Sequence, residues 1–485
     1  MRKFVVLAGA TALASCNFAP AYRQPVAPIS ATFPQADGQG GEQNGTRAGA
    51  RAATDLGWRD YFGDLRLQAL IAAALANNRD LAQSVARVAQ ARAQYRIQDA
   101  DRLPQLNLQA GASRNRTPLN SLAFPGSGSG SGGADSFTLN QFSVGASVSS
   151  FELDFWGRVR NLSEAQRREY LATVEAERAF RLSLIGQVAA TYLQIRAGEE
   201  QIALAERSVT GRREGLVIAR KRMDAGVTST VDYDQAALLV TQAETELADL
   251  RRTTQQSENL LTVLVGGPIA DTLPAPRPLS DPGQYTNLQP GLPSSLLENR
   301  PDILQAEQRL RAANANIGAA RAAFLPRISL TGLLGFVSPQ LGSLIQGSSF
   351  QYQTAANATQ PILTWGKSSA GVALTKAQAD ELVAAYQRAA QGAFREVADA
   401  LVARRQYAEQ IEAQVRTVDA QRRLARVARL RYDHGLSIYL EVLDAERSLF
   451  SAEQQLLALR SAQLQSEVSL YVALGGGLKE TVSAG

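Results

Sequence analysis

The chain has 485 residues, of which 45% are hydrophobic and 20% are charged, a balance that excludes a disordered chain and a helical membrane protein. Its net charge of +5 is spread along the sequence, so we predict no nucleic-acid partner. One cysteine, Cys16, excludes a disulfide framework and a cysteine-ligated metal site, and one histidine, His434, leaves almost no room for a zinc site or a histidine-based triad. Composition therefore argues against an enzyme, and we assign no catalytic residue, metal ligand or cofactor.

Residues 1–15 are predicted to be a lipoprotein signal peptide. Arg2 and Lys3 precede an apolar run over residues 4–14, which is too short to span a bilayer. The run ends in Leu-Ala-Ser-Cys, which resembles a bacterial lipobox, so we expect Cys16 to carry a diacylglycerol and an N-acyl chain. A plain signal peptide with a chance cysteine is the alternative. Because residue 17 is Asn rather than Asp, the usual inner-membrane retention signal is absent, and we expect a lipid anchor in the outer membrane, followed by an extension over residues 16–60.

The sequence contains two copies of one unit. The segment 77–80 recurs at 299–302 and the segment 103–108 recurs at 325–330, both 222 residues later (80 to 302). Farther along, Gly226 and Gly435 occupy matching positions 209 residues apart (226 to 435), because the first copy has a longer loop with a Gly/Ser run at 126–133. We predict repeats at residues 61–267 and 294–477, a linker at 268–293 and a tail at 478–485.

Each copy predicts one very long helix and a shorter return helix. Residues 158–224 and 367–433 are 67 residues each without proline and are rich in helix formers. Gly226 and Gly435 are expected to end these helices as C-caps, and the return helices are predicted at 228–265 and 437–474. A seam of apolar residues seven apart on the last helix indicates supercoiling; its members are Leu443, Phe450, Leu457, Leu464 and Tyr471. A soluble coiled-coil stalk would show the same helices.

Two short stretches in each copy alternate between apolar and polar residues, as half-exposed strands do. Over residues 140–149 the even positions are mostly apolar and the odd positions small and polar, and residues 105–113, 327–330 and 350–357 behave alike. Such segments are typical of transmembrane barrel strands, although a soluble sandwich also alternates. Four strands cannot close a barrel, for which about eight is the minimum, so identical copies would have to share one.

The run Gly291 to Ile303, with its continuation Leu325-Pro326-Arg327-Ile328, resembles the TolC-like outer membrane factors, most closely the lipoprotein branch that serves resistance-nodulation-division efflux pumps. The resemblance implies a mainly α fold with a transmembrane β part. Three protomers would share a 12-stranded outer-membrane β-barrel, continued by a 12-helix periplasmic α-barrel with an equatorial belt from the linker. It implies a passive exit duct for drugs or other small molecules, supplied by a periplasmic adaptor and an inner-membrane transporter. An exit duct for polypeptides of a type I secretion system, or a periplasmic coiled-coil lipoprotein without a pore, are the alternatives.

The resemblance also implies a gate at the periplasmic tip, where each long helix turns. Leu440 matches an apolar ring and Asp444 an acidic ring, with Glu441, Asp232 and Asp234 as further acids. Arg447 could pair with Asp444 or with a neighbouring helix and latch the closed state. The acids could also merely stabilise the first turns of their helices. Gly226 and Gly435 would let an adaptor dock closely. Arg431 and Tyr432 would help the latch or have a surface role, and His434 is expected to be a solvated turn residue rather than a pH switch.

Overall fold

The computed structural model describes residues 17–30, 32–33, 51–52, 56–118, 136–270, 272–286, 288–289 and 293–476. The predictions for the signal peptide, Cys16, the Gly/Ser run, the first residues of the Gly291 run and the tail at 478–485 lie outside these residues. The chain divides into two compact units. We call residues 1–24, 89–171 and 307–384 the sheet unit, and residues 25–88, 172–306 and 385–485 the helical unit. Each is described by itself.

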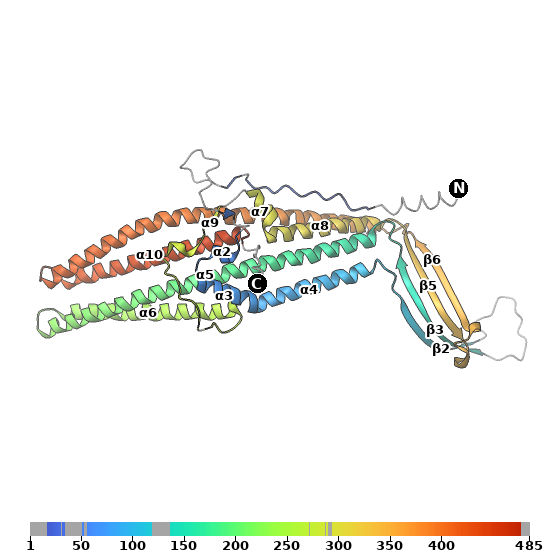
Figure 1. Cartoon of the computed structure of the whole chain (residues 1–485), viewed down its shortest axis with the longest axis horizontal. Helices are drawn as coiled ribbons and strands as arrows, with labels where there is room; N and C mark the ends of the chain where they lie inside the picture. The colour runs from blue at the N-terminus through green and yellow to red at the C-terminus, as the bar shows by residue number, and fades with distance from the viewer. Residues whose placement is uncertain are drawn as a thin grey trace, which may run out of the picture. The chain divides into compact units, whose positions relative to one another are not determined.

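The sheet unit contains one four-stranded antiparallel sheet. Its strands are β2 (Asn107–Pro118), β3 (Ser136–Glu152), β5 (Arg327–Ser338) and β6 (Phe350–Thr359), in the spatial order β2-β3-β5-β6 (Figure 1). The predicted strand pair of each repeat is confirmed, and the two hairpins join through β3 and β5. Two short 3-10 turns, Leu341–Ser343 and Gly347–Ser349, connect β5 to β6. Within the described residues β2 and β6 each have one neighbour, so both edges of the sheet are open.

The strand register collects the predicted apolar side chains on one face. Val144 lies opposite Ala110 on one side and Phe336 on the other, and Phe336 lies opposite Phe350. These positions alternate with Ser143 and its polar neighbours, so the alternation seen in the sequence becomes a true two-faced sheet. Strand β5 departs from the pattern, because Leu333 and Val337 share the polar face through their pairing with Ser147 and Ser143. Tyr352 is 74% exposed and Leu334 54% exposed, so the apolar face is uncovered in a single chain.

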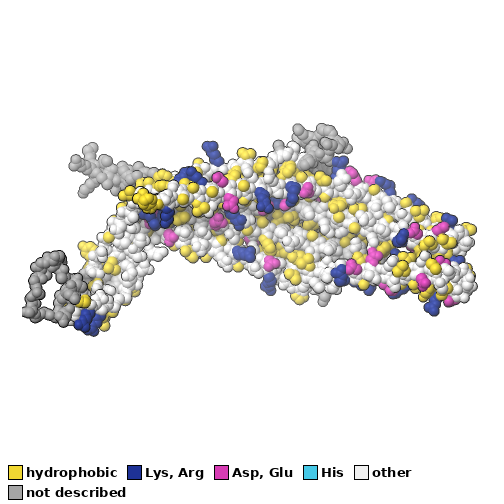
Figure 2. Space-filling model, turned by 180° about the vertical axis from the view of Figure 1, so that it is seen from behind, with side chains coloured by type: hydrophobic (Ala, Val, Ile, Leu, Met, Phe, Trp, Pro, Cys, Tyr) yellow, Lys and Arg dark blue, Asp and Glu magenta, His cyan; other side chains and the backbone are white. Residues whose placement is uncertain are grey.

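Charged side chains occur only at the two ends of the described strands. Arg114 and Arg116 lie toward the end of β2. At the other end of the sheet, Glu152 of β3 pairs with Arg327 of β5 at 3.0 Å and with Arg158 at 2.6 Å. Figure 2 shows the sheet almost entirely in yellow and white, with a dark blue patch beside the grey loop. The middle of the sheet is therefore an uncharged band bounded by ionic ends.

The two very long helices are confirmed with their predicted bounds, α5 (Arg158–Asp224) and α9 (Lys367–Asp433). The other helices of the repeats are α3 (Leu65–Asn77), α4 (Arg79–Ala100), α6 (Thr230–Val265), α7 (Pro293–Asn299), α8 (Pro301–Ala322) and α10 (Tyr439–Ala473), with a short α2 (Trp58–Tyr61) before them. In the helical unit α6 returns along α5 and α10 along α9 as two antiparallel hairpins (Figure 1). No helix among the described residues is both long and apolar enough to cross a membrane.

The core of the helical unit is built from aromatic rings and the heptad seam. Tyr61 and Tyr471 stack with ring centroids 4.2 Å apart, and Phe62 meets the Tyr471 ring edge-on at 5.6 Å. The seam on α10 is confirmed, since four of its five residues are buried and Leu457 packs partly buried against its neighbours. The predicted linker contributes the 3-10 turn Pro282–Gln284 and the two-residue strand β4 (Leu288–Gln289), which pairs in parallel with β1 (Arg51–Ala52).

The residues directly before α4 and α8 form matching hydrogen bonds to the ends of the return helices. Asn78 donates from its amide Nδ2 to the carbonyl of Leu264, near the end of α6, at 2.8 Å. Arg300, 222 residues later (78 to 300), donates to the carbonyl of Ala473 at the end of α10, also at 2.8 Å. Leu264 and Ala473 are themselves 209 residues apart (264 to 473). In both copies, therefore, the residue before the second helix donates a hydrogen bond to a carbonyl in the last turn of the return helix, where carbonyls lack a partner within the helix.

Candidate functional site

The ends of α5 and α9 form two turns of identical construction, which we call the tip turns. Gly226 has φ 69° and Gly435 has φ 72°, a left-handed conformation that favours glycine. The amide of Val227 donates to the carbonyl of Arg222 and that of Gly226 to Met223, both at 2.9 Å. The second turn repeats both bonds at 2.8–2.9 Å, between Leu436 and Arg431 and between Gly435 and Tyr432. These are Schellman motifs, so the predicted glycine caps are confirmed.

The return helices begin two residues later than predicted. Ser229 (ψ 163°) and Ile438 (ψ 155°) precede them in extended conformations, so α6 starts at Thr230 and α10 at Tyr439. After a Schellman turn the chain must reverse direction before the next helix can begin. The residues that make this reversal are ones that helix propensity alone would assign to the return helix. Thr228 and Ser437, the corresponding residues inside the two turns, bury their hydroxyl oxygens without a hydrogen-bond partner within the described residues.

The predicted gate acids lie in the first two turns of the return helices, with Asp232 and Glu441 in the first turns. Asp444 pairs with Arg447 at 2.5 Å, with side chains 63% and 65% exposed, so the predicted pairing within α10 is present. Glu441 reaches Arg431 of α9 at 3.6 Å. Asp232 and Asp234 lie in the matching part of α6, where Asp232 corresponds to Glu441 across the 209-residue repeat (232 to 441). Exposed ion pairs of this kind stabilise the fold by only roughly 0–1 kcal/mol, so their main effect is on the local electrostatic potential.

Apolar side chains cover the surface around these acids. Leu440 is 52% exposed, and Val231, its counterpart in the first repeat, is 57% exposed. Val227 and Leu436, which follow the two cap glycines, are 63% and 70% exposed. Both tip turns therefore present apolar groups at matching positions, near the acids of the return helices. His434 is exposed, as expected for a turn residue, and Tyr432 is buried, with its ring under the guanidinium of Arg222 at 4.7 Å.

Sequence reasoning missed the contact that joins the two hairpins at the tip. Tyr439, the first residue of α10, is only 9% exposed and its ring lies 5.0 Å from that of Tyr432. Its hydroxyl fills the space where Gly215 of α5 has no side chain, since a Cβ there would lie 1.7 Å from the Tyr439 oxygen. The sequence marks Gly215 only as a weak point in a helix, and nothing local connects it to Tyr439. Burial, and next the nearby Glu446, raise the pKa of Tyr439 to about 12, so the phenol stays neutral.

A half-buried charged cluster lies behind this contact. Glu446 of α10 approaches Arg429 of α9 at 3.8 Å. Arg212 of α5 donates to the carbonyl of Leu239 in α6 at 2.9 Å and lies 5.7 Å from the Phe450 ring. Burial raises the pKa of the Glu446 carboxyl and lowers that of the Arg212 guanidinium, so both groups are held where their charged forms are disfavoured. Within the described residues, no group of three or more His, Cys, Asp or Glu side chains could hold a metal ion.

Comparison with known proteins shows the family of the chain that carries these tip turns. A family model described as outer membrane efflux protein matches residues 70–267 and 292–476. The chain belongs to this family. The solvent efflux pump outer membrane protein SrpC of Pseudomonas putida is 42% identical over 465 residues, which cover 96% of each chain. The cation efflux system protein CusC of Escherichia coli is 39% identical over 477 residues, which cover 97% of this chain and 98% of CusC.

The solved structures most relevant here are outer-membrane channels, like the relatives found by sequence. The open state of the MtrE outer membrane channel of Neisseria gonorrhoeae superposes with a TM-score of 0.83 at 38% identity, covering 96% of this chain and 99% of MtrE. A CusC crystal structure gives a TM-score of 0.82 at 37% identity. The resemblance stated from the sequence is therefore confirmed, and this outer membrane efflux protein acts as the outer-membrane channel of an efflux system. Its mainly helical fold with a strand part agrees with that of solved efflux channels.

Proposed function

We propose that three copies of the chain assemble into a passive exit duct, the outer-membrane part of a tripartite pump. The observation that carries this proposal is the sheet, which in the described part of the chain has two open edges and an uncharged middle. Open edges leave backbone groups unpaired, which lipid does not tolerate. Three sheets of four strands would close one 12-stranded barrel, and the long helices would form a 12-helix periplasmic barrel below it. The exposed Leu334 and Tyr352 would then face lipid.

The partners proposed are a periplasmic adaptor and an inner-membrane transporter of the resistance-nodulation-division type, with drugs or other small molecules as cargo. Family membership and the efflux-pump names of the relatives support this choice over polypeptide secretion. The adaptor would dock at the tip turns, where Val227 and Leu436 are exposed. An added Cβ on Gly226 or Gly435 would meet no atom within 4 Å, so both glycines lie open to a partner.

A lipid anchor on Cys16 is proposed as well. The first described residue, Asn17, accepts a hydrogen bond at 2.9 Å from Asn161, which lies in the first turn of α5, shortly after strand β3 ends. Arg321 donates to the carbonyl of Phe18 at 3.2 Å, and Asn314 to that of Pro20 at 2.7 Å. The mature chain would thus begin close to the ionic end of the sheet, at the depth where acyl chains could enter the membrane. Cys16→Ser should abolish labelling of the protein by radioactive palmitate, and retained labelling would contradict the anchor.

The gate is proposed at the tip, with Leu440 as the apolar constriction and Asp444, Glu441, Asp232 and Asp234 as acidic groups. Three-fold repetition of carboxylates in a narrow pore concentrates negative potential and favours cations. Arg447 would hold Asp444 in place in the closed state through their 2.5 Å contact.

The double variant Asp444→Ala with Arg447→Ala tests the gate in planar bilayers. We expect higher single-channel conductance and weaker cation selectivity. Asp249→Ala with Arg252→Ala is the matched control, because this pair on α6 has the same spacing and the same 2.5 Å contact but lies away from the tip turns. If both double variants conduct alike, the gate assignment fails; if the wild type forms no channel at all, the exit-duct proposal fails.

A further inference from the structure

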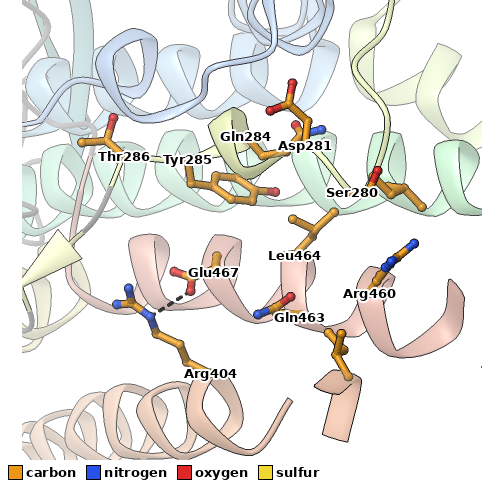
Figure 3. Close-up of a pocket in the computed structure, with 12 residues that line it drawn as sticks. Ser280, Asp281, Gln284, Tyr285, Thr286, Arg404, Arg460, Gln463, Leu464 and Glu467 are labelled. Atoms are coloured by element: carbon orange, nitrogen blue, oxygen red, sulfur yellow. Dashed lines mark ion pairs between the residues drawn. The ribbon is translucent and has the colours of Figure 1, made fainter. Parts of the chain in front are cut away.

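The helical unit contains a cavity that the exit-duct function does not use. It has a volume of about 580 Å³, within the range of sites for small ligands. The predicted linker forms one wall through residues 279–286, and α9 and α10 form the others (Figure 3). Leu279, Ile411 and Leu464 are the aliphatic side chains in a lining that is otherwise polar or charged, apart from the Tyr285 ring. The cavity lies far from the tip turn along α10. This helix begins at Tyr439, and the first of its residues in the cavity lining is Arg460.

Among the described residues around the cavity, one cation has no ion-pair partner. Arg404 pairs with Glu467 at 3.0 Å, the contact drawn as a dashed line in Figure 3. Asp281 pairs with Arg277 at 3.5 Å and accepts a second bond from the amide of Gly283 at 2.8 Å. Both acids are therefore compensated. Arg460, half-buried on α10, has no ion pair or hydrogen bond with any residue that the structure describes.

A second polar group is also unsatisfied. The hydroxyl of Tyr285 is buried and has no hydrogen-bond partner in the described part of the chain, although its ring packs 5.3 Å from that of Tyr61. In Figure 3 the Tyr285 ring extends from the linker toward Leu464, and Arg460 lies beyond Leu464 on α10. Burial, and next the carboxylate of Glu467, raise the pKa of Tyr285, so the phenol remains a hydrogen-bond donor at neutral pH. A buried donor without an acceptor costs roughly 1–3 kcal/mol unless a ligand or water accepts its bond.

We propose that this cavity binds a small amphipathic monocarboxylate, whose carboxylate pairs with Arg460 and whose apolar body packs against Leu279 and Leu464, with the Tyr285 hydroxyl as a second donor. A single negative charge matches Arg460, the one cation in the cavity lining that has no partner among the described residues. A phosphate or a dicarboxylate would bring further charge next to Glu467 and Asp281, which disfavours both. A guanidinium binds a carboxylate with two parallel hydrogen bonds, which adds geometric specificity to the pairing of charges.

The probe for this site is 4-phenylbutyrate, with its neutral amide as the comparison ligand. Binding to the full-length protein in detergent micelles is measured by saturation-transfer NMR, with empty micelles subtracted. We expect a dissociation constant on the order of a millimolar, as for other ligands of this size, and at least roughly tenfold weaker binding of the amide.

Three variants decide whether the cavity is the site. Arg460→Gln should weaken phenylbutyrate binding about tenfold or more, and Arg423→Gln, an exposed arginine on α9 outside the cavity, should leave it unchanged. Tyr285→Phe should weaken binding several-fold without lowering the unfolding temperature, because its hydroxyl makes no hydrogen bond within the described fold. Equal affinity for acid and amide, unchanged binding by Arg460→Gln, or no binding above empty micelles would each overturn the proposal.

Discussion

Replacing Gly215 by alanine is predicted to loosen the tip, whereas the same change at Gly211, one helical turn earlier, is predicted to be harmless. Both glycines lie inside α5, where alanine is normally more stable by about 0.5–1 kcal/mol. At Gly211 an added Cβ meets nothing within 4 Å, so this gain is expected in full. At Gly215 the Cβ would lie 1.7 Å from the hydroxyl and 3.0 Å from the ring of Tyr439.

Tyr439 has little room to yield at that position. Its side chain is 9% exposed and packs against the Tyr432 ring, with ring centroids 5.0 Å apart. Overpacking of this kind costs about 1–3 kcal/mol. If opening of the tip separates α10 from α5, the cost falls on the closed state alone, and the ratio of closed to open channels should fall by a factor of about 5–150 relative to Gly211→Ala.

The assay is the open probability of single channels in planar bilayers, recorded for both alanine variants. Tyr439→Leu in the Gly215→Ala background should recover much of the closed population, because it removes the group that clashes, and the double-mutant cycle isolates the coupling between the two positions. Equal open probabilities for Gly211→Ala and Gly215→Ala would refute the idea that Tyr439 locks the two hairpins together.

Burial raises the pKa of Glu446, so the packed tip holds this proton more tightly than a tip in which the carboxyl is solvated. Acidification from about pH 7.5 to about pH 5 should therefore favour closed channels in the wild type and have little effect in Glu446→Gln, and an identical pH profile for the two proteins would contradict this. Arg300→Gln removes contacts to Asp302 at 2.7 Å, Glu396 at 2.8 Å and the Ala473 carbonyl at 2.8 Å. Because the two carboxylates are 41% and 47% exposed and can be solvated, we expect the free energy of unfolding to fall by about 1–3 kcal/mol. Thermal unfolding measures this change, with Arg416→Gln as the control. The partner of Arg416, Glu412, is 77% exposed, so the control should leave the free energy of unfolding almost unchanged.

The sequence alone determined the features that depend on near neighbours along the chain. The bounds of α5 and α9 follow from 67 residues without proline that end in Gly226 and Gly435, because helix formation and Schellman capping involve residues only three to five apart. The two faces of the sheet follow equally from the period-two alternation, and the 209- and 222-residue spacings established the duplication.

Tertiary structure decided which of those residues matter at the tip and in the cavity. Gly211 and Gly215 look alike in the sequence, and only the approach of Tyr439, 224 residues away (215 to 439), separates them. Likewise, nothing local distinguishes Arg460 from the paired arginines around it. It has no partner among the described residues because of which side chains the linker, α9 and α10 bring together at the cavity. Local pattern specifies backbone conformation, whereas burial and charge balance arise from packing between segments that the pattern does not connect.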